Sequence, residues 1–416
     1  MPHASVTSRN AWLTAGLAGF AVTTGTLVGL ILPSPPDAPA FLPGGLAAPL
    51  ALFGPPVPAP RATAATVPAW LTDRLSPPDP GTARPAEVAA FFARIAPAEA
   101  TALTRRFPEI VGNLDGAPTA LRYTANAMRF PQAAGRQILA YDESAGGRLV
   151  EVLGDLDTAD RTVILIPGVD TDVTNFDTGL GKVERRAPRW QAHRLHDRIT
   201  TAHPDTRIAV VAWLGYDPPE GMGTATVRED RAAAGAAALV RFVDGLLLGH
   251  PDRSVVLVGH SYGSTVTGLA APHLGAQVTD LIAIGSPGMG VTDRPDLRTS
   301  ARVWACAAPG DWIRRVPGVR LLGLGHGTLP SDPEFGALPL PCDDVTGHDG
   351  YYDPGASALP AIGAIAAGGI PRTDPGAGSA AAGLLGPAGE RGVAGEHVAT
   401  GDTPESLAAR TEGDVE

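Results

Sequence analysis

A serine lies between two glycines in Gly259-His260-Ser261-Tyr262-Gly263. The apolar run 255–259 predicts a buried strand before it, and 262–274 predicts a helix after it. A serine in so tight a turn projects its hydroxyl outward, and only glycines two positions away avoid a clash. The pattern predicts a nucleophile, Ser261, with the N–H of Tyr262 as an oxyanion donor. The alternative is an ordinary turn without chemistry.

A serine nucleophile needs a base, and four histidines follow Ser261: His273, His326, His348 and His397. Two of them fall in the helix after the serine and in the C-terminal tail, which leaves His326 and His348. We expect His348 to be the base, because it lies in a glycine-flanked loop shortly before the last predicted helix, 359–367. His260 is expected to point to the opposite side of the turn and to be structural.

Asp311 is the expected orienting carboxylate. It follows 302–306, the second strand predicted after the serine, where it could hold the imidazole and stabilise its protonated form. The rivals are Asp280, Asp343, Asp344 and Asp349. Asp280 begins a strand instead of ending one, and Asp349 adjoins His348 and would point elsewhere.

A second oxyanion donor is expected in the loop Pro167-Gly168-Val169-Asp170-Thr171, after the predicted strand 162–166. Gly168 would let the backbone approach a substrate closely, and Val169 or Asp170 could donate an N–H. A plain turn is the alternative.

Short β-branched runs alternate with Ala/Leu-rich stretches along the chain. The runs predict strands at 148–153, 162–166, 207–213, 255–259, 280–284 and 302–306, and the stretches between them predict helices at 182–203, 229–248 and 262–274. This alternation indicates an α/β fold with a mostly parallel sheet flanked by helices. The stretch 86–130 predicts two or more helices that form an N-terminal cap.

The uncharged segment 11–32 follows Arg9. As a helix it would be roughly 33 Å long, enough to cross a bilayer core. Because no Lys or Arg follows until Arg61, the rest of the chain is expected outside the cytoplasm. An uncleaved membrane anchor and a signal peptide cleaved near Ala38-Pro39-Ala40 both fit, and a buried helix is a third possibility.

Composition divides the chain into five parts. We expect a signal peptide or N-terminal membrane anchor over 1–40, a Pro-rich linker over 41–85, a helical cap over 86–140, the catalytic α/β domain over 141–368, and a disordered acidic tail over 369–416.

The net charge of −11, without a Lys/Arg-rich run, argues against a nucleic-acid partner. No cofactor or metal is expected, since the sequence has no zinc-type Cys/His spacing, phosphate-binding loop or dinucleotide fingerprint. Cys306 and Cys342 precede Asp311 and His348, so a disulfide between them would tie the acid loop to the histidine loop. Two buried thiols are the alternative.

Several motifs in order resemble a largely actinobacterial family of α/β-hydrolases, long catalogued as a domain of unknown function. The motifs are Gly112-Asn113-Leu114-Asp115-Gly116, Ile166-Pro167-Gly168-Val169, Trp213-Leu-Gly-Tyr-Asp217, Gly259-His-Ser-Tyr-Gly-Ser264, Gly285-Ser-Pro-Gly288 and Gly347-His348. The resemblance covers most of 86–365 and implies the α/β-hydrolase fold with a Ser261/Asp311/His348 triad, but no settled substrate. The chain departs from the family at Asp349, where a small residue is expected.

These features predict an extracytoplasmic serine hydrolase that cleaves small-molecule or lipid esters, held at the membrane by its N-terminal segment if that segment is not removed. The segment 214–228 is a candidate lid or pocket wall. An acyltransferase with the same triad and a non-catalytic, membrane-anchored binding module are the alternatives. The sequence does not specify an oligomeric state.

Overall fold

The computed structural model describes residues 78, 82–144, 147–221, 223–316, 318, 320 and 324–371. The expected leader, nearly all of the expected linker and the expected tail from residue 372 onward lie outside these ranges. None of the helices within them is long and apolar enough to cross a membrane.

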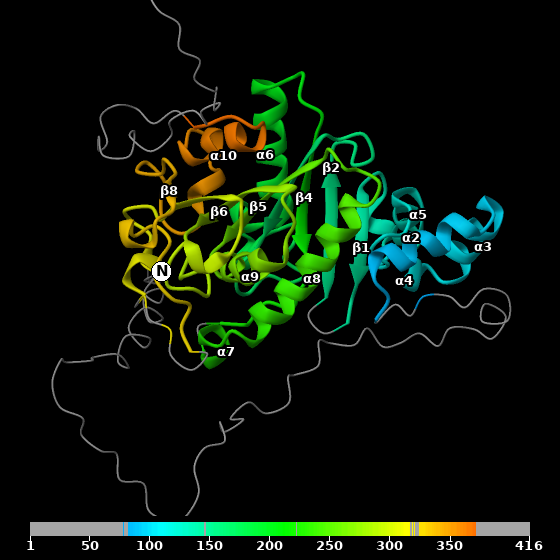
Figure 1. Cartoon of the computed structure of the whole chain (residues 1–416), viewed down its shortest axis with the longest axis horizontal. Helices are drawn as coiled ribbons and strands as arrows, with labels where there is room; N and C mark the ends of the chain where they lie inside the picture. Colours follow the sequence, from blue (N-terminus) through cyan, green and yellow to red (C-terminus); the bar gives the residue numbers. More distant parts are fainter. Residues whose placement is uncertain are drawn as a thin grey trace, which may run out of the picture. The chain divides into compact units, whose positions relative to one another are not determined.

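An eight-stranded sheet forms the centre of the described domain (Figure 1), with the order β1-β2-β4-β3-β5-β6-β7-β8. The strands are β1 (Gln137–Asp142), β2 (Arg148–Leu153), β3 (Arg161–Ile166), β4 (Ile208–Leu214), β5 (Ser254–His260), β6 (Val278–Ile284), β7 (Arg302–Cys306) and β8 (Leu338–Pro339). Strand β2 is antiparallel to both of its neighbours, whereas every other neighbouring pair is parallel. The six strands expected from the sequence are confirmed as β2 to β7, and the expected α/β class with them.

The helices are α2 (Pro85–Arg94), α3 (Pro97–Arg106), α4 (Pro108–Val111), α5 (Thr119–Arg129), α6 (Pro188–Ala202), α7 (Thr224–Val227), α8 (Asp230–Leu247), α9 (Tyr262–Ala270) and α10 (Ala358–Ala366). The helix expected over 182–203 begins later, at Pro188. A proline suits the first position of a helix, where its missing N–H needs no acceptor. Two 3₁₀ turns, Leu180–Lys182 and Glu184–Arg186, occupy the start of the expected range instead.

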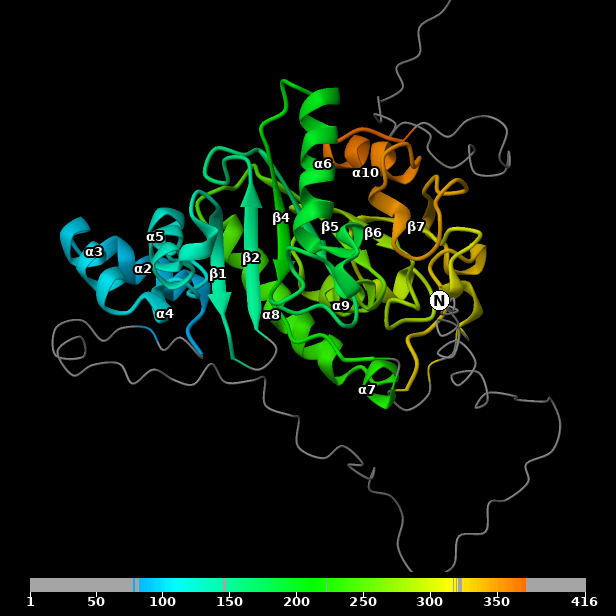
Figure 2. The same cartoon turned by 180° about the vertical axis from the view of Figure 1, so that it is seen from behind.

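Helices cover both faces of the sheet. Figures 1 and 2 show α6 and α10 on one face and α8 and α9 on the other. Side chains of strand β5 pack on both faces of the sheet, because successive side chains of a strand point in opposite directions. Val256 and Val258 belong to the apolar cluster that includes Leu195 of α6, and Val255 and Leu257 to the cluster under α8 and α9. The sheet is therefore buried on both sides.

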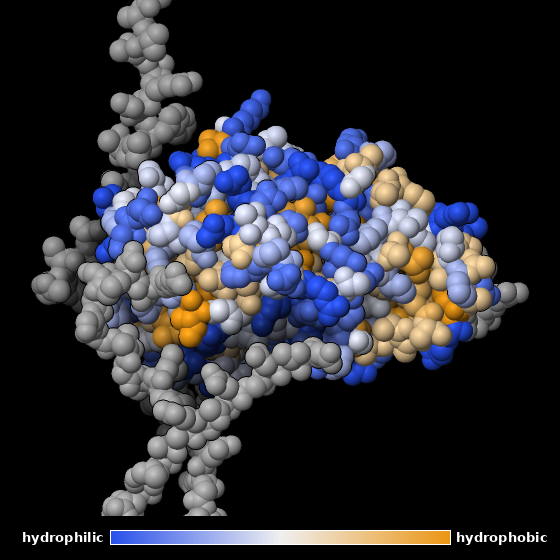
Figure 3. All heavy atoms as spheres, turned by 90° about the horizontal axis from the view of Figure 1, so that it is seen from above, coloured by the Kyte–Doolittle hydropathy of each residue, from blue (hydrophilic) through white to orange (hydrophobic). Residues whose placement is uncertain are grey.

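The N-terminal helices α2 to α5 form their own apolar cluster around buried residues such as Phe91 and Leu103. Two asparagines join this cap to β1: Asn126 Nδ2 donates to the Ile138 carbonyl (3.1 Å), and Asn113 Nδ2 donates to the Tyr141 carbonyl (2.8 Å). Figure 3 shows apolar residues gathered at the right-hand end, over these helices. Asn113 thereby gives the Gly112–Gly116 motif a structural role.

The parallel strands bring the candidate residues to one edge of the sheet. Strands β3, β5, β6 and β7 are successive neighbours in the sheet and are all parallel. They therefore end at the same edge of the sheet. The loops that follow β3, β5 and β7 carry Gly168, Ser261 and Asp311. Ligand sites of open α/β sheets form at this carboxyl edge.

Candidate active site

Ser261 lies in a strained turn between β5 and α9. Its backbone has φ 52° and ψ −128°, a region that L-residues with a side chain rarely occupy, and it is 5% exposed. A Cβ atom on Gly259 would lie 2.5 Å from Ser264 Cα, and one on Gly263 would lie 2.3 Å from the Ile166 carbonyl oxygen. The turn therefore requires glycine at both positions.

The turn is held by the end of β6 and the motif after it. The Ser261 N–H donates to the Ile284 carbonyl (3.0 Å). Ser264 Oγ lies 2.6 Å from the Ser261 carbonyl oxygen and 2.6 Å from Ser286 Oγ, which in turn accepts a hydrogen bond from Gly288 N (3.1 Å). The Gly285–Gly288 motif therefore supports the serine turn.

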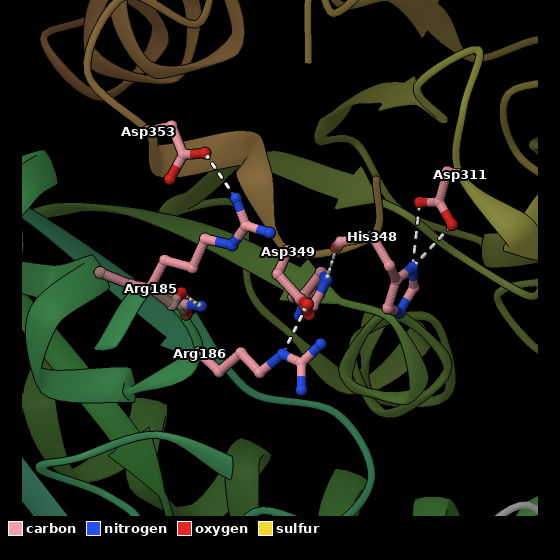
Figure 4. A network of polar contacts seen from close by, with 8 residues as sticks. Arg185, Arg186, Asp311, His348, Asp349 and Asp353 are labelled. Atoms are coloured by element: carbon pink, nitrogen blue, oxygen red, sulfur yellow. Dashed lines mark hydrogen bonds and ion pairs between the residues drawn. The ribbon is translucent and has the colours of Figure 1, made fainter. Parts of the chain in front are cut away.

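His348 and Asp311 form a close hydrogen-bonded pair (Figure 4). His348 Nδ1 donates to both carboxylate oxygens of Asp311, at 2.8 Å and 2.9 Å. A carboxylate accepts and does not donate, so this contact fixes the proton on Nδ1 and leaves Nε2 as the basic nitrogen. The pair has the arrangement in which an aspartate orients a histidine base.

Asp311 is completely buried and its oxygens have two further donors. The Tyr351 hydroxyl donates to Oδ2 (2.6 Å) and the Ile313 N–H donates to Oδ1 (2.9 Å). Burial raises the pKa of Asp311, but the hydrogen bond and charge attraction of His348, together with the bonds from Tyr351 and Ile313, lower that pKa below its usual value. Asp311 is therefore ionised at neutral pH.

Trp312 packs on the His348 ring, and sequence reasoning missed it. Its ring centroid lies 4.8 Å from that of His348 with 47° between the planes, and the residue is 37% exposed. Its position directly after Asp311, at the start of a 3₁₀ turn, could have signalled this contact.

The expectation that His260 points away from the site is wrong. His260 Nε2 donates to the His348 carbonyl (2.8 Å), and the two rings lie 4.8 Å apart. Strand alternation gives the reason: His260 shares a face of β5 with Val256 and Val258, whose apolar cluster includes Tyr351 of the histidine loop. Burial, reinforced by repulsion from His348, lowers the pKa of His260 to about 4.

His326, the alternative base, is turned elsewhere. It is buried, its Nε2 lies 2.8 Å from the Thr226 carbonyl oxygen, and its ring packs edge-on against Tyr262 at 5.4 Å. Burial lowers the pKa of His326. Nothing joins it to Asp311 in the described residues, so the geometry favours His348. His273 ends the 3₁₀ turn after α9, and His397 lies outside the described ranges.

The rival carboxylates have other partners. Asp280 accepts hydrogen bonds from Arg302 (2.7 Å) and Trp304 (2.8 Å), near the start of β6 and so at the opposite edge of the sheet. Asp344 binds Ser357. Asp349 pairs with Arg186 at 2.6 Å, which gives the departure from the family pattern a structural role (Figure 4). Asp343 has no hydrogen bond or ion pair among the described residues.

The loop after β3 contacts the serine turn directly. A Cβ atom on Gly168 would lie 2.7 Å from Ser261 Cβ, so only glycine fits there. The Asp170 N–H already donates to the Pro219 carbonyl (3.0 Å), which leaves Val169 as the donor with no acceptor in the described residues. Tyr262 begins α9, so its N–H has no acceptor within the helix. Val169 and Tyr262 are the two candidate oxyanion donors.

Ser261 and His348 are neighbours without a direct hydrogen bond between them in the described structure. Both adjoin the end of β6: Ser261 N binds Ile284, and a Cβ atom on the next residue, Gly285, would lie 3.1 Å from His348 Cε1. Catalytic hydrogen bonds of this kind are often long before substrate binds.

The segment expected to be a lid or pocket wall packs on Tyr262. The Tyr262 hydroxyl donates to the Arg228 carbonyl (2.8 Å), and Gly325 N donates to the Val227 carbonyl (2.9 Å). Two loops, one after β4 and one before β8, thus meet beside the serine turn. Val227 and Leu324 are 40% and 52% exposed there.

Cys306 and Cys342 are buried free thiols in this structure. Burial, followed by a hydrogen bond between the two side chains, raises the pKa of Cys306. The expected disulfide stays a prediction. In the part of the chain that the structure describes, no group of three or more His, Cys, Asp or Glu residues could hold a metal ion.

A family model matches this chain, and the curated relatives that it resembles are described only as uncharacterized proteins. A family model described as alpha/beta hydrolase matches residues 142–321, a range that includes Ser261 and Asp311. An uncharacterized protein of Mycobacterium bovis is 33% identical over 198 residues, which cover 47% of this chain and 67% of that protein. An uncharacterized protein of Mycobacterium tuberculosis is 30% identical over 274 residues, 56% of this chain, and the match spans only 39% of that protein.

Solved structures with similar folds are more distant. A serine hydrolase without a lid from Xanthomonas campestris is 17% identical, with a TM-score of 0.33 over 58% of this chain and 98% of that one. A carboxylesterase from Mesorhizobium loti is also 17% identical, with a TM-score of 0.32 over 55% of this chain and 98% of that one. The family match and the mycobacterial relative, together with the sheet order, confirm the resemblance seen in the sequence: the chain belongs to the alpha/beta hydrolase family.

Proposed function

We propose that this protein is a serine hydrolase that cleaves carboxylic esters, with Ser261 as nucleophile, His348 as base and Asp311 as the orienting acid. One observation carries the proposal: His348 Nδ1 is bound by both oxygens of a fully buried aspartate, beside a strained serine turn. A buried carboxylate paired with a histidine at a nucleophile elbow suits acyl transfer better than it suits ligand binding alone.

The reaction begins when His348 Nε2 takes the proton of Ser261 as the hydroxyl oxygen attacks the ester carbonyl carbon. The negative charge that forms on the carbonyl oxygen is stabilised by the N–H groups of Val169 and Tyr262. The tetrahedral intermediate then expels the alcohol, which takes the proton back from His348, and Ser261 is left acylated. Water attacks the acyl-enzyme with His348 again as base, which releases the carboxylic acid and restores the serine.

We also propose that this reaction occurs outside the cytoplasm, on the basis of the uncharged segment 11–32 behind Arg9. A site at the outer surface of the membrane would meet envelope lipids, which favours ester over peptide substrates. Small-molecule and lipid esters are both candidate substrates.

The proposal is tested with a fluorophosphonate, which phosphonylates only activated serines. The full chain in mild detergent is exposed to the reagent and its intact mass is measured, with Ser261→Ala as the matched control. We expect one adduct on the wild type and none on the variant. Esters of graded acyl length, and matched amides, then identify the substrate class, and added alcohols reveal any acyl transfer.

A folded wild-type protein that gains no adduct would overturn the proposal and favour a binding module. An adduct that persists in Ser261→Ala would move the nucleophile to another residue.

A further inference from the structure

We propose that His260 is a positioning residue for the catalytic base: it holds the main chain of His348 at a fixed place relative to Ser261. This inference rests on the proposed function. His260 is the last residue of β5 and directly precedes Ser261, so its hydrogen bond to His348 ties the loop of the base to the residue next to the nucleophile.

The contact between His260 and His348 has two parts. His260 Nε2 donates to the His348 carbonyl oxygen at 2.8 Å, and the two imidazole rings lie 4.8 Å apart at 39°. A carbonyl oxygen only accepts, so the proton of His260 must be on Nε2. Tyr351 adds a further ring contact at 5.9 Å from His260, so the ring is enclosed by the same loop that it binds.

His260 suits this role because it is neutral. Its surroundings keep the ring uncharged through the pH range in which a histidine base works, and burial is the main cause. A charged donor such as lysine at this place would repel the imidazolium that forms on His348 during the reaction. A neutral donor holds the loop that carries His348 without repelling this imidazolium.

Three anchors then restrain the base, each at a different group. Asp311 binds the His348 ring at Nδ1, His260 binds the His348 carbonyl, and Arg186 binds the next side chain, Asp349, at 2.6 Å. Figure 4 shows Asp311 and Arg186 approaching the His348–Asp349 turn from opposite sides. In the His348 ring, Nδ1 is bound by Asp311 and Nε2 has no partner among the described residues, so Nε2 is left for the serine.

The test compares two substitutions that each keep one part of the contact. His260→Gln places an amide N–H near the position of Nε2 and loses the ring. His260→Phe keeps a ring and loses the donor, which leaves the His348 carbonyl without its bond. The rates measured are fluorophosphonate labelling of Ser261 and ester hydrolysis, with kcat and KM resolved.

We expect His260→Phe to lower the labelling rate and kcat by roughly 10- to 100-fold with KM within about twofold, because positioning errors of this kind act on the chemical step. For His260→Gln, the labelling rate and kcat should lie within about fivefold of the wild-type values, since the hydrogen-bond donor is restored. Asn126→Leu is the control for lost stability: it removes buried hydrogen bonds from α5 to Gly112 in the cap and to Ile138 in β1, and should leave kcat unchanged.

The same substitutions in a His348→Ala background decide whether His260 acts through the base. We expect His260→Phe to cause no further loss there, because groups that act as a unit are not additive. A further loss equal to that in the wild-type background, or equal rates for His260→Phe and the wild type, would overturn the inference. Absence of labelling in the wild type itself would instead refute the proposed function.

Discussion

Gly168 and Ser261 are packed so closely that a Cβ atom on Gly168 would lie 2.7 Å from Ser261 Cβ and 3.2 Å from its hydroxyl oxygen. The loop after β3 thus approaches Ser261 with its backbone. Such an approach is what an oxyanion donor requires, because the N–H must face the carbonyl oxygen of a substrate bound to the serine.

Gly168→Ala should lower kcat/KM by roughly 100-fold, since the loop must retreat and carry the Val169 N–H with it. The free energy of unfolding should fall by about 1–3 kcal/mol from overpacking. Ester hydrolysis and urea unfolding measure the two effects. Gly275→Ala is the matched control, because nothing lies within 4 Å of a Cβ atom there. Equal activity of both variants would remove this loop from the catalytic site.

Replacing each of the two candidate bases, His348 and His326, should lower kcat to very different extents. His348→Ala should lower kcat by at least roughly 1,000-fold, as loss of a triad member does. His326→Ala removes a buried hydrogen bond to Thr226 and a ring contact with Tyr262, and should lower kcat by no more than about tenfold. Single-turnover hydrolysis separates the two variants. The reverse ranking would transfer the role of base to His326.

Tyr351→Phe tests the environment of Asp311. The pKa of Asp311 is lowered in the folded protein, so its ionised form contributes stability above the unfolded value of about 4, and this contribution is lost as the pH falls through the folded value. Without the Tyr351 hydroxyl the pKa of Asp311 rises, and about 1–3 kcal/mol of unfolding free energy should be lost at pH 7.

The difference in unfolding free energy between Tyr351→Phe and the wild type should narrow as the pH is lowered from 7 to about 3. Protonation of Asp311 weakens the bond from the Tyr351 hydroxyl in the wild type, and the variant has no such bond to lose. Urea unfolding over this range provides the measurement. Tyr352→Phe is the control: this neighbour is also buried, and its hydroxyl has no hydrogen bond among the described residues. A gap that does not change with pH would show that Asp311 is not responsible.

Cys306 and Cys342 are expected to form a disulfide when the protein is oxidised, since their thiols are in contact and the chain is expected to be exported. The bond would close a loop of 36 residues (342 − 306) and stabilise the protein by roughly 3–4 kcal/mol. Alkylation of the unfolded, unreduced protein measures it, because bridged cysteines do not react.

Two variants sharpen the test of the disulfide. Cys306→Ser and Cys342→Ser should each unfold at the urea concentration of the reduced wild type, and reductant should not change the unfolding midpoint of either variant.

Cys342 lines a cavity of about 970 Å³ between α6, β8 and α10, so it is the thiol that a reagent should reach first in the folded, reduced protein. Alkylation of both cysteines without reductant would exclude the bridge.

The Arg186–Asp349 pair should tune the base through the turn that carries it. Asp349→Asn is expected to lower kcat/KM by about two- to fivefold, a small effect because the pair is partly exposed and worth about 1 kcal/mol at most. High salt should lower wild-type activity to the same level and leave the variant unchanged. Asp160→Asn breaks the exposed pair with Arg207 and is the control. An equal response of the wild type and Asp349→Asn to salt would contradict this role.

The sequence alone determined the strands from β2 to β7 and the serine turn, because each depends on neighbours in the chain. Short apolar runs rich in β-branched residues predict a buried strand, and Gly259 is required by a contact inside the turn itself, with Ser264. Asp311 and His348 were also predicted from order along the chain: Asp311 follows the second strand predicted after the serine, and His348 lies in a glycine-flanked loop before the last predicted helix.

Only the tertiary structure decided how His348 is held. His260 contacts a residue 88 positions away and Arg186 one 163 positions away, and neither pairing leaves a local signal in the sequence. Strand β8, just two residues long and containing Pro339, is likewise defined only by its pairing with β7. Such contacts depend on the register of the sheet and on the packing of loops from different strands, so they are set when the whole domain folds.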